Sequence, residues 1–253
     1  MGTAQASKTD TTPTLELVYR VQWGDTNLGI ATSQWHFTDT SYRMEAMAKS
    51  EGALAFLYEF EGTNTLEGEI KDGAYLPSHF TSNSDYDDEN YVIDMTWPRG
   101  IQIPKFKVEP EVELDKVHPL RTATLRNVVD PYTAMLMALS DLEATGKCEG
   151  SYRVFDGRRR TKFLLKDFGM TEIEQDTDWA YQGTAHRCGT ATELIGGHKL
   201  DSNYDPEEAK DFEKRQIFVA QLDNGMLMPV RIEISSFLGS LTIRLDMKAS
   251  QFH

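Results

Sequence analysis

Residues 15–23, LELVYRVQW, show an alternation of apolar and polar residues that recurs in much of this chain. The odd positions are apolar, whereas Glu16, Arg20 and Gln22 lie between them. Successive side chains of a β-strand point to opposite faces, so this alternation places one face against a core and the other toward water. The same period returns near the end of the chain, where Leu241, Ile243, Leu245 and Met247 alternate with Thr242, Arg244, Asp246 and Lys248. Both stretches are predicted to be half-buried strands.

Short turn sequences separate these stretches and indicate how the strands pair. Residues 24–27 (GDTN), 71–73 (KDG) and 223–225 (DNG) have turn chemistry, and Asp156-Gly157 favours a two-residue type I′ hairpin turn. Strands joined by short turns pair antiparallel, because a parallel pair needs a long crossover. Pro104 cannot donate to a sheet ladder, so residues 101–108 are predicted to form an edge strand or a bulge.

One helix is predicted at about residues 131–145. Asp130 is a good N-cap, Pro131 suits the first helical position, and Gly146 is a plausible end. The apolar residues of this segment cover more than one narrow stripe, so the helix is expected to be buried on most sides, for instance against the concave face of a sheet. Residues 205–215 are predicted to form a short, charged surface helix.

Composition excludes several classes of function. The chain has 253 residues, a formal net charge of −14 and 40% hydrophobic residues, which is enough for a packed core and opposes binding to nucleic acid or to anionic membranes. It has no stretch of eighteen apolar residues, so no transmembrane segment is expected. Residues 1–13 are small and polar and are predicted to be a disordered tail, either a remnant of an expression vector or the start of an exported protein whose signal peptide is absent. Residues 14–250 are predicted to form a single domain.

The two cysteines, Cys148 and Cys188, are too far apart in sequence for a CxxC motif. They form either a disulfide or two buried thiols, and their even number favours the disulfide. Such a loop would contribute about 3–4 kcal/mol and would indicate an oxidising compartment such as a bacterial periplasm. His186 lies near Cys188, but the scattered histidines show no metal-ligand spacing, so neither a metal nor another cofactor is expected.

Catalytic signatures are lacking: the sequence has no GxSxG elbow and no glycine-rich phosphate loop, so we do not expect an enzyme. Arg158, Arg159 and Arg160 either bind an anionic group or pair with the chain's own acids, and we favour the second interpretation. The segment 51–60 is densely apolar from Leu54 onward and is predicted to form either a short helix or a buried loop. Several large side chains either line an apolar pocket or form plain core. These side chains are Trp23, Trp35, Phe56, Tyr58, Phe60, Trp97 and Met135.

Several blocks together resemble a family of bacterial exported proteins known as domain of unknown function 3108. They include residues 17–24, 130–134 (DPYTA), 148–150, 154–159 (VFDGRR) and 228–233. The motif residues are Asp130, Pro131, Phe155, Asp156, Gly157 and Arg158. The resemblance implies a periplasmic, non-enzymatic β protein with a strongly curved antiparallel sheet. In more distant relatives, the LolA/LolB carriers and β-spiral proteins, such a sheet wraps around a helix and can shelter an acyl chain.

The fold class expected from these observations is mainly β: a single curved antiparallel sheet forms an open β-barrel or β-spiral, with the main helix packed against or inside it. Curvature also removes the hazard of a long, flat, exposed sheet edge. The expected function is a periplasmic protein of the cell envelope that binds or carries a lipid-like hydrophobic ligand. The alternatives are a structural or interaction protein that binds another envelope protein without a ligand and, third, a hydrolase of envelope polymers.

Overall fold

The computed structural model describes residues 14–52, 55, 59–86, 89–202, 204–236 and 239–252. The predicted tail, most of segment 54–60, and with it Phe56 and Tyr58, lie outside the described residues. The described strands are β1 (Thr14–Trp23), β2 (Thr26–Phe37), β3 (Ser41–Ser50), β4 (Phe60–Lys71), β5 (Ala74–Tyr86), β6 (Glu89–Thr96), β7 (Lys105–Glu109), β8 (Gly150–Phe155), β9 (Arg160–Ile173), β10 (Gly183–Gly196), β11 (Arg215–Gln221), β12 (Leu227–Ser236), β13 (Gly239–Leu245) and β14 (Gln251–Phe252). The helices are α1 (Pro131–Thr145), α2 (Pro206–Ala209) and the 3₁₀ turn η2 (Thr122–Leu125).

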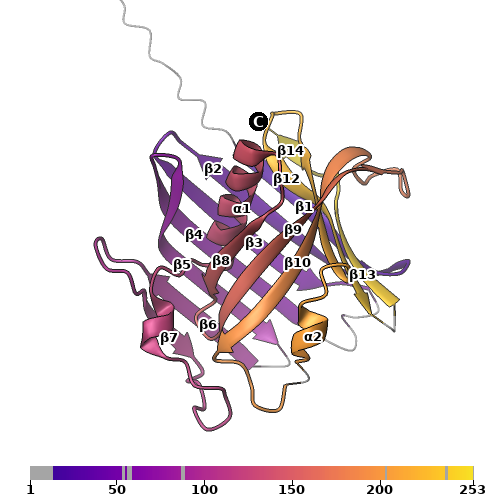
Figure 1. The fold of residues 1–253 in the computed structure, drawn as a ribbon. Helices are drawn as coiled ribbons and strands as arrows, with labels where there is room; N and C mark the ends of the chain where they lie inside the picture. Colours follow the sequence, from indigo (N-terminus) through magenta and orange to yellow (C-terminus); the bar gives the residue numbers. More distant parts are fainter. Residues whose placement is uncertain are drawn as a thin grey trace, which may run out of the picture.

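All these strands belong to one antiparallel sheet, in the order β7-β6-β5-β4-β3-β2-β1-β13-β12-β11-β10-β9-β8, with β14 beside β1. Two meanders, β1 to β7 and β8 to β13, meet where β1 pairs with β13 and Tyr19 lies opposite Leu245. Figure 1 shows this sheet curving around α1. The fold is therefore mainly β and barrel-like, and the sheet is not closed by a backbone ladder, as the sequence predicted.

The two edge strands, β7 and β8, face each other across a seam that side chains close. The rings of Phe106 and Phe155 lie edge to face with centroids 4.9 Å apart. The guanidinium of Arg158 donates to the carbonyl oxygens of Glu109 and Pro110, at 2.8 Å each. Gly157 has φ of +94°, and a Cβ at this position would lie 2.4 Å from the Ile93 side chain, so glycine permits the close approach. These side-chain contacts join the two edges, no backbone ladder among the described residues pairs β7 with β8, and Val129 bonds to the backbone of β8 at Arg153 and Phe155.

Helix α1 begins and ends where the sequence predicted. The Asp130 carboxylate accepts from the backbone N–H groups of Tyr132 and Thr133, and Gly146 ends the helix in the left-handed conformation with φ of 70°. The helix contacts β5, β8 and β12, so it lies on the concave face of the sheet. Neither helix of the described chain has the length and apolar character needed to cross a membrane.

The core lies between α1 and a row of large side chains that runs across β1 to β6. Strand register places these residues opposite one another, and each is at most 3% exposed. They are Leu15, Trp35, Met44, Leu66, Phe80 and Met95. Tyr132 of α1 contacts this row, with its ring centroid 6.3 Å from that of Trp35 and 6.2 Å from that of Phe80.

Three local predictions were wrong. Asp156-Gly157 is not a two-residue turn, because the Asp156 carboxylate accepts from the N–H groups of Arg158 and Arg159 and so holds a four-residue loop between β8 and β9. The edge strand β7 begins at Lys105 rather than at residue 101, directly after Pro104, which has no N–H to pair. The charged helix predicted within residues 205–215 is a single turn, α2.

The seam can be tested by replacing Phe106 with alanine. We expect the free energy of unfolding to fall by about 1–2 kcal/mol, because the change removes an aromatic pair and part of the cover of Phe155. Met47→Ala is a matched control: Met47 is 44% exposed against 42% for Phe106, but it lies on the outer face of β3. Urea unfolding should show a change within about 0.5 kcal/mol for this control. Equal effects of the two substitutions would contradict the role of the seam.

Candidate functional site

An apolar pocket of about 420 Å³ lies between α1 and the concave face of β8 to β12. The helix side consists of Pro131, Tyr132, Ala134, Met135, Ala138, Leu139 and Leu142. The sheet side consists of Cys148, Val154, Asp156, Thr161, Phe163, Leu165, Cys188, Ile217, Val219, Pro229 and Ile232. We call this space the apolar pocket. Its volume falls within the range of about 300–1,000 Å³ that is usual for small-molecule sites.

The sheet wall of the apolar pocket follows from strand alternation. Phe163 and Leu165 are two positions apart on β9 and point to the same face, and Ile217 and Ile232 lie opposite each other on β11 and β12. These four side chains point into the barrel, yet they are only partly buried. Inward-facing apolar side chains of a filled core would be fully buried, so this part of the barrel interior is hollow.

The cysteines are joined in a disulfide that forms part of the pocket wall. Cys148 follows α1 and Cys188 lies on β10, and their Cα atoms are 5.4 Å apart. Each residue is 2% exposed, and both line the apolar pocket. The disulfide therefore ties the chain at the end of α1 to the opposite wall. Among the described residues, no group of three or more His, Cys, Asp and Glu side chains is placed to hold a metal ion.

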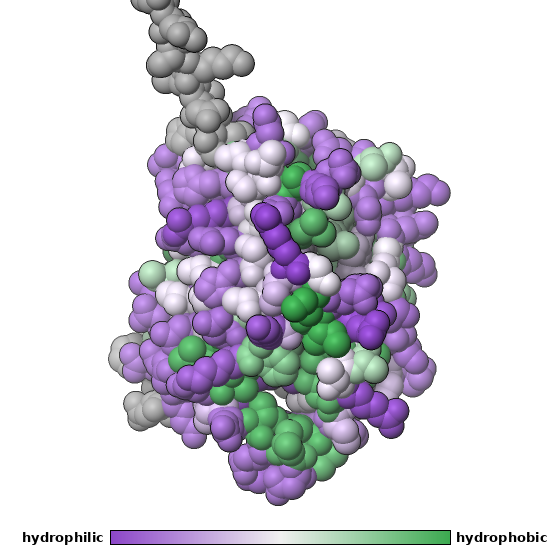
Figure 2. All heavy atoms as spheres, turned by 90° about the vertical axis from the view of Figure 1, so that its left-hand side faces the viewer, coloured by the Kyte–Doolittle hydropathy of each residue, from purple (hydrophilic) through white to green (hydrophobic). Residues whose placement is uncertain are grey.

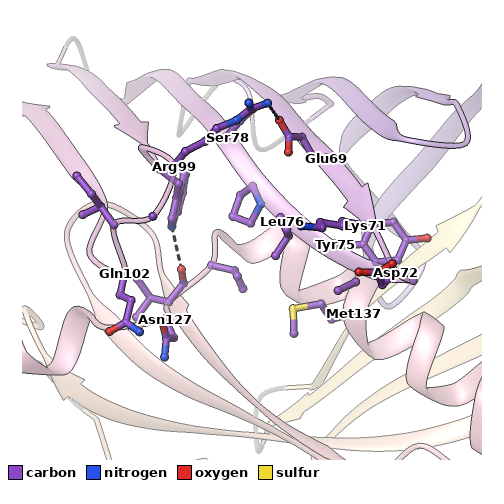
Figure 3. Close-up of a pocket in the computed structure, with 18 of the residues that line it drawn as sticks. Glu69, Lys71, Asp72, Tyr75, Leu76, Ser78, Arg99, Gln102, Asn127 and Met137 are labelled. Atoms are coloured by element: carbon purple, nitrogen blue, oxygen red, sulfur yellow. Dashed lines mark hydrogen bonds and ion pairs between the residues drawn. The ribbon is translucent and has the colours of Figure 1, made fainter.

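A second pocket, of about 1080 Å³, lies on another side of α1, toward the β4–β5 hairpin and the loop after β6 (Figure 3). We call it the polar pocket, because its mixed lining is more polar than that of the apolar pocket. Lys71, Asp72, Tyr75 and Met137 lie toward one side of it, and Gln102 and Asn127 toward the other. Arg99 and Glu69 form an exposed ion pair at 2.5 Å, so these two charges satisfy each other. The ionisable side chains are spread around the rim and do not converge on one point.

Exposed apolar side chains stand at the rim of this polar pocket. Leu76 is 44% exposed and Ile101 is 51% exposed, and both line the pocket. Figure 2 views the molecule from this side and shows apolar residues, in green, gathered on the lower part of the face.

Asp130 joins α1 to the sheet at the pocket's Tyr132 end. Its side chain is fully buried, and burial raises the pKa of its carboxyl group although the hydrogen bonds from Thr133 and Tyr132 oppose the shift. Thr133 Oγ1 donates to the carboxylate at 2.5 Å and lies 2.9 Å from the hydroxyl of Tyr42 on β3. This buried network fixes the start of α1 against the N-terminal half of the sheet.

The residues of the resemblance motif gather at the seam and at the start of α1. Asp130 and Pro131 begin the helix, Phe155 is fully buried under Phe106, and the loop from Asp156 to Arg158 reaches β6 and β7. The three consecutive arginines divide between two kinds of partner. Arg159 pairs with Asp156, whereas Arg158 and Arg160 donate mainly to backbone carbonyl oxygens. Among the described residues, the predicted pairing with an acid is therefore correct for Arg159 and wrong for Arg158 and Arg160, which bind backbone carbonyl groups instead.

The aromatic side chains singled out in the sequence occupy different places. Met135 lines the apolar pocket and Trp97 lines the polar pocket, where its indole N–H donates to the Val128 carbonyl at 2.9 Å. Trp35 is 2% exposed within the core, and Trp23 is 38% exposed at the far end of β1. Phe60 is partly buried at the start of β4. Sequence reasoning missed the wall residues Phe163, Leu165, Ile217 and Ile232, although the alternation on β12, where Ile232 lies between Arg231 and Glu233, was a signal for one of them.

The family described as "Protein of unknown function (DUF3108)" matches residues 18–246. This chain belongs to the DUF3108 family. A solved structure similar to this DUF3108 protein is that of a beta-barrel-like protein of domain of unknown function DUF1849 from Brucella abortus, at 12% sequence identity and a TM-score of 0.51. The likeness covers 96% of this chain and 98% of the other, and it shows the barrel-like fold alone. No curated protein is similar enough to the DUF3108 chain to count as a match.

Proposed function

We propose that this protein is a non-enzymatic module of the cell envelope, located in the periplasm, that binds or carries a lipid-like hydrophobic molecule in the apolar pocket. The observation that carries the proposal is the hollow between α1 and β9 to β12, where apolar side chains point inward and are only partly buried. Apolar surface left without protein contacts favours a hydrocarbon occupant, because each CH₂ group removed from water contributes about 0.8 kcal/mol.

The disulfide supports the proposed location. Cys148 and Cys188 are joined and buried, and disulfides of this kind persist in oxidising compartments such as the bacterial periplasm. A carrier needs a wall that keeps its shape while the hydrocarbon enters and leaves. The disulfide supplies such a constraint, because it connects the end of α1 with β10 across the apolar pocket.

Filling the apolar pocket should abolish hydrocarbon binding. Ala138 of α1 lines the pocket and is partly buried, so a tryptophan there would occupy the space where the hydrocarbon lies. Ala144→Trp is the matched control, because Ala144 lies on the same helix, is exposed and is not a pocket residue. We expect Nile red, an uncharged hydrophobic dye, to bind the wild type and Ala144→Trp with similar affinity and to bind Ala138→Trp at least tenfold more weakly.

Native mass spectrometry after gentle purification provides a second readout, in which we expect masses of co-purified lipid on the wild type. A clean protein mass together with no uptake of Nile red would contradict the proposal and would favour a structural or interaction protein without a ligand. Equal dye binding by the wild type and Ala138→Trp, with both folded by circular dichroism, would place the dye elsewhere and contradict this site.

A further inference from the structure

We infer that the ligand is an uncharged amphiphile, whose hydrocarbon lies in the apolar pocket and whose neutral, hydrogen-bonding head group lies against the inner faces of β2 to β5 next to Tyr132. This inference rests on the proposed function and narrows it to a class of ligand. It depends on three observations: the size of the inward side chains, the polar groups beside Tyr132, and the absence of charge on these inner faces.

The side chains that point into the barrel are smaller in the row next to the core row than in the core row itself. The core row, which contains Trp35, Met44, Leu66 and Phe80, fills the interior beside α1. Two residues further along each strand, on the same face, the next row reads Leu17, Ser33, Ala46, Asn64, Ser82 and Ile93. From β2 to β5 the large apolar side chains of the first row are thus replaced by small or polar ones. We call Ser33, Ala46, Asn64 and Ser82 the polar wall.

The residues of the polar wall keep part of their surface exposed. Ser33, Ala46, Asn64 and Ser82 point inward, yet each is only partly buried. The row after it continues with the small residues Ala31, Ala48, Gly62 and Ser84, and the Phe60 ring lies over Gly62. These side chains are smaller than Trp35 and Phe80 of the core row, and the surface that they leave exposed is where we place the head group.

Tyr132 connects the polar wall to the apolar pocket. Its ring lines the pocket, and its hydroxyl oxygen accepts a hydrogen bond from Nδ2 of Asn64 at 3.1 Å. Burial raises the pKa of Tyr132 to about 12, so its hydroxyl keeps its proton at neutral pH. Among the described residues, the Tyr132 hydroxyl hydrogen and the Asn64 Oδ1 have no hydrogen-bond partner, which leaves one donor and one acceptor where the hydrocarbon pocket ends.

Neither the polar wall nor the apolar pocket offers a charge to a ligand. The charged side chains of β3, such as Arg43, Glu45 and Lys49, alternate with the inward positions and lie on the outer face. Asp156 is the one charged residue that lines the apolar pocket among the described residues. Its carboxylate already accepts from the N–H groups of Arg158 and Arg159 and from Nε of Arg159. A carboxylate or phosphate head group would therefore be buried without a cation, at a high cost in free energy.

Competition between ligands of one chain length tests the inference. Nile red bound to the wild type should be displaced at pH 8 by 1-monooleoylglycerol at least tenfold more effectively than by oleate, which shares the chain but carries a negative charge. Oleamide is uncharged and can donate and accept hydrogen bonds, so it should displace Nile red about as effectively as 1-monooleoylglycerol does. Oleate that competes as well as the glycerol ester would overturn the inference and leave the proposed function standing, whereas no binding of any probe would overturn both.

Substitutions at Asn64 and Tyr132 test where the head group binds. Asn64→Leu should weaken the binding of 1-monooleoylglycerol about three- to tenfold, as expected for the loss of one or two hydrogen bonds. It should leave the affinity for Nile red unchanged. Asn83→Leu is the matched control, because Asn83 is exposed on the outer face of β5. Tyr132→Phe keeps the ring and removes the hydroxyl group. It tests the same hydrogen bond if Asn64→Leu lowers the stability of the protein. Unchanged affinity for 1-monooleoylglycerol in both variants would overturn the assignment.

Discussion

Replacing Asp130 with alanine is expected to lower the free energy of unfolding by about 3 kcal/mol. The carboxylate caps α1 through the N–H groups of Tyr132 and Thr133, which contributes about 0.5–2 kcal/mol, and it accepts from the Thr133 hydroxyl. Thr133 is fully buried, so losing this partner adds a desolvation cost of about 1–3 kcal/mol. Urea unfolding followed by circular dichroism measures the change.

Asp205 provides a matched control for Asp130. It is also followed by proline, and its carboxylate also accepts from two N–H groups, those of Glu207 and Glu208, but it is exposed and caps the single turn α2. Asp205→Ala should cost less than about 1 kcal/mol. Equal losses in the two variants would show that the burial of Asp130 adds nothing to its cap.

The pH dependence of the Asp130→Asn variant gives a second check. Burial raises the pKa of Asp130 in the folded protein above the value of about 3.9 of an unfolded aspartate. The folded state then binds the proton more tightly, so protonation of this group favours folding. The stability of the wild type relative to Asp130→Asn should rise as the pH falls through the folded pKa and level off below the unfolded pKa. A relative stability that falls over this window would mean that the carboxylate form is the favoured one.

The sequence carried enough information to predict the strands and α1 because local chemistry decides them. Residues 15–23 alternate in a way that only an extended chain satisfies, and Asp130, Pro131 and Gly146 mark both ends of α1 regardless of its surroundings. The β8–β9 loop was mispredicted for a local reason as well. A type I′ turn competes there with the Asp156 side chain, whose two N–H partners stabilise a longer loop.

The apolar pocket could not be predicted in the same way. Alternation shows that Ile232 points inward, but it does not show whether the space it faces is filled, which depends on α1, more than eighty positions earlier in the sequence. Trp35 and Phe163 are both large, inward-facing aromatic residues, yet Trp35 meets α1 in the core while Phe163 faces the hollow. Only the register across many strands separates the filled row from the row of small residues that includes Asn64 and Ser82.

The largest loss of stability is expected when both cysteines are replaced, because the Cys148–Cys188 disulfide closes a loop with a sequence separation of 40. Constraining a loop of this length in the unfolded chain corresponds to about 4 kcal/mol. The Cys148→Ala, Cys188→Ala double variant should therefore unfold at a clearly lower urea concentration than the wild type. Under non-reducing conditions, the wild type should show no free thiol by alkylation and intact mass.

The disulfide should also resist reduction while the protein is folded, because each cysteine is only 2% exposed. Dithiothreitol should shift the wild-type unfolding curve toward that of the double variant only when reduction is carried out in urea. In the double variant, α1 loses its covalent tie to β10, so we expect Nile red to bind more weakly even where circular dichroism shows a folded sheet. Unchanged dye affinity in a folded double variant would mean that α1 holds its distance from the sheet through Asp130 and packing alone, and that the disulfide acts only on the unfolded chain.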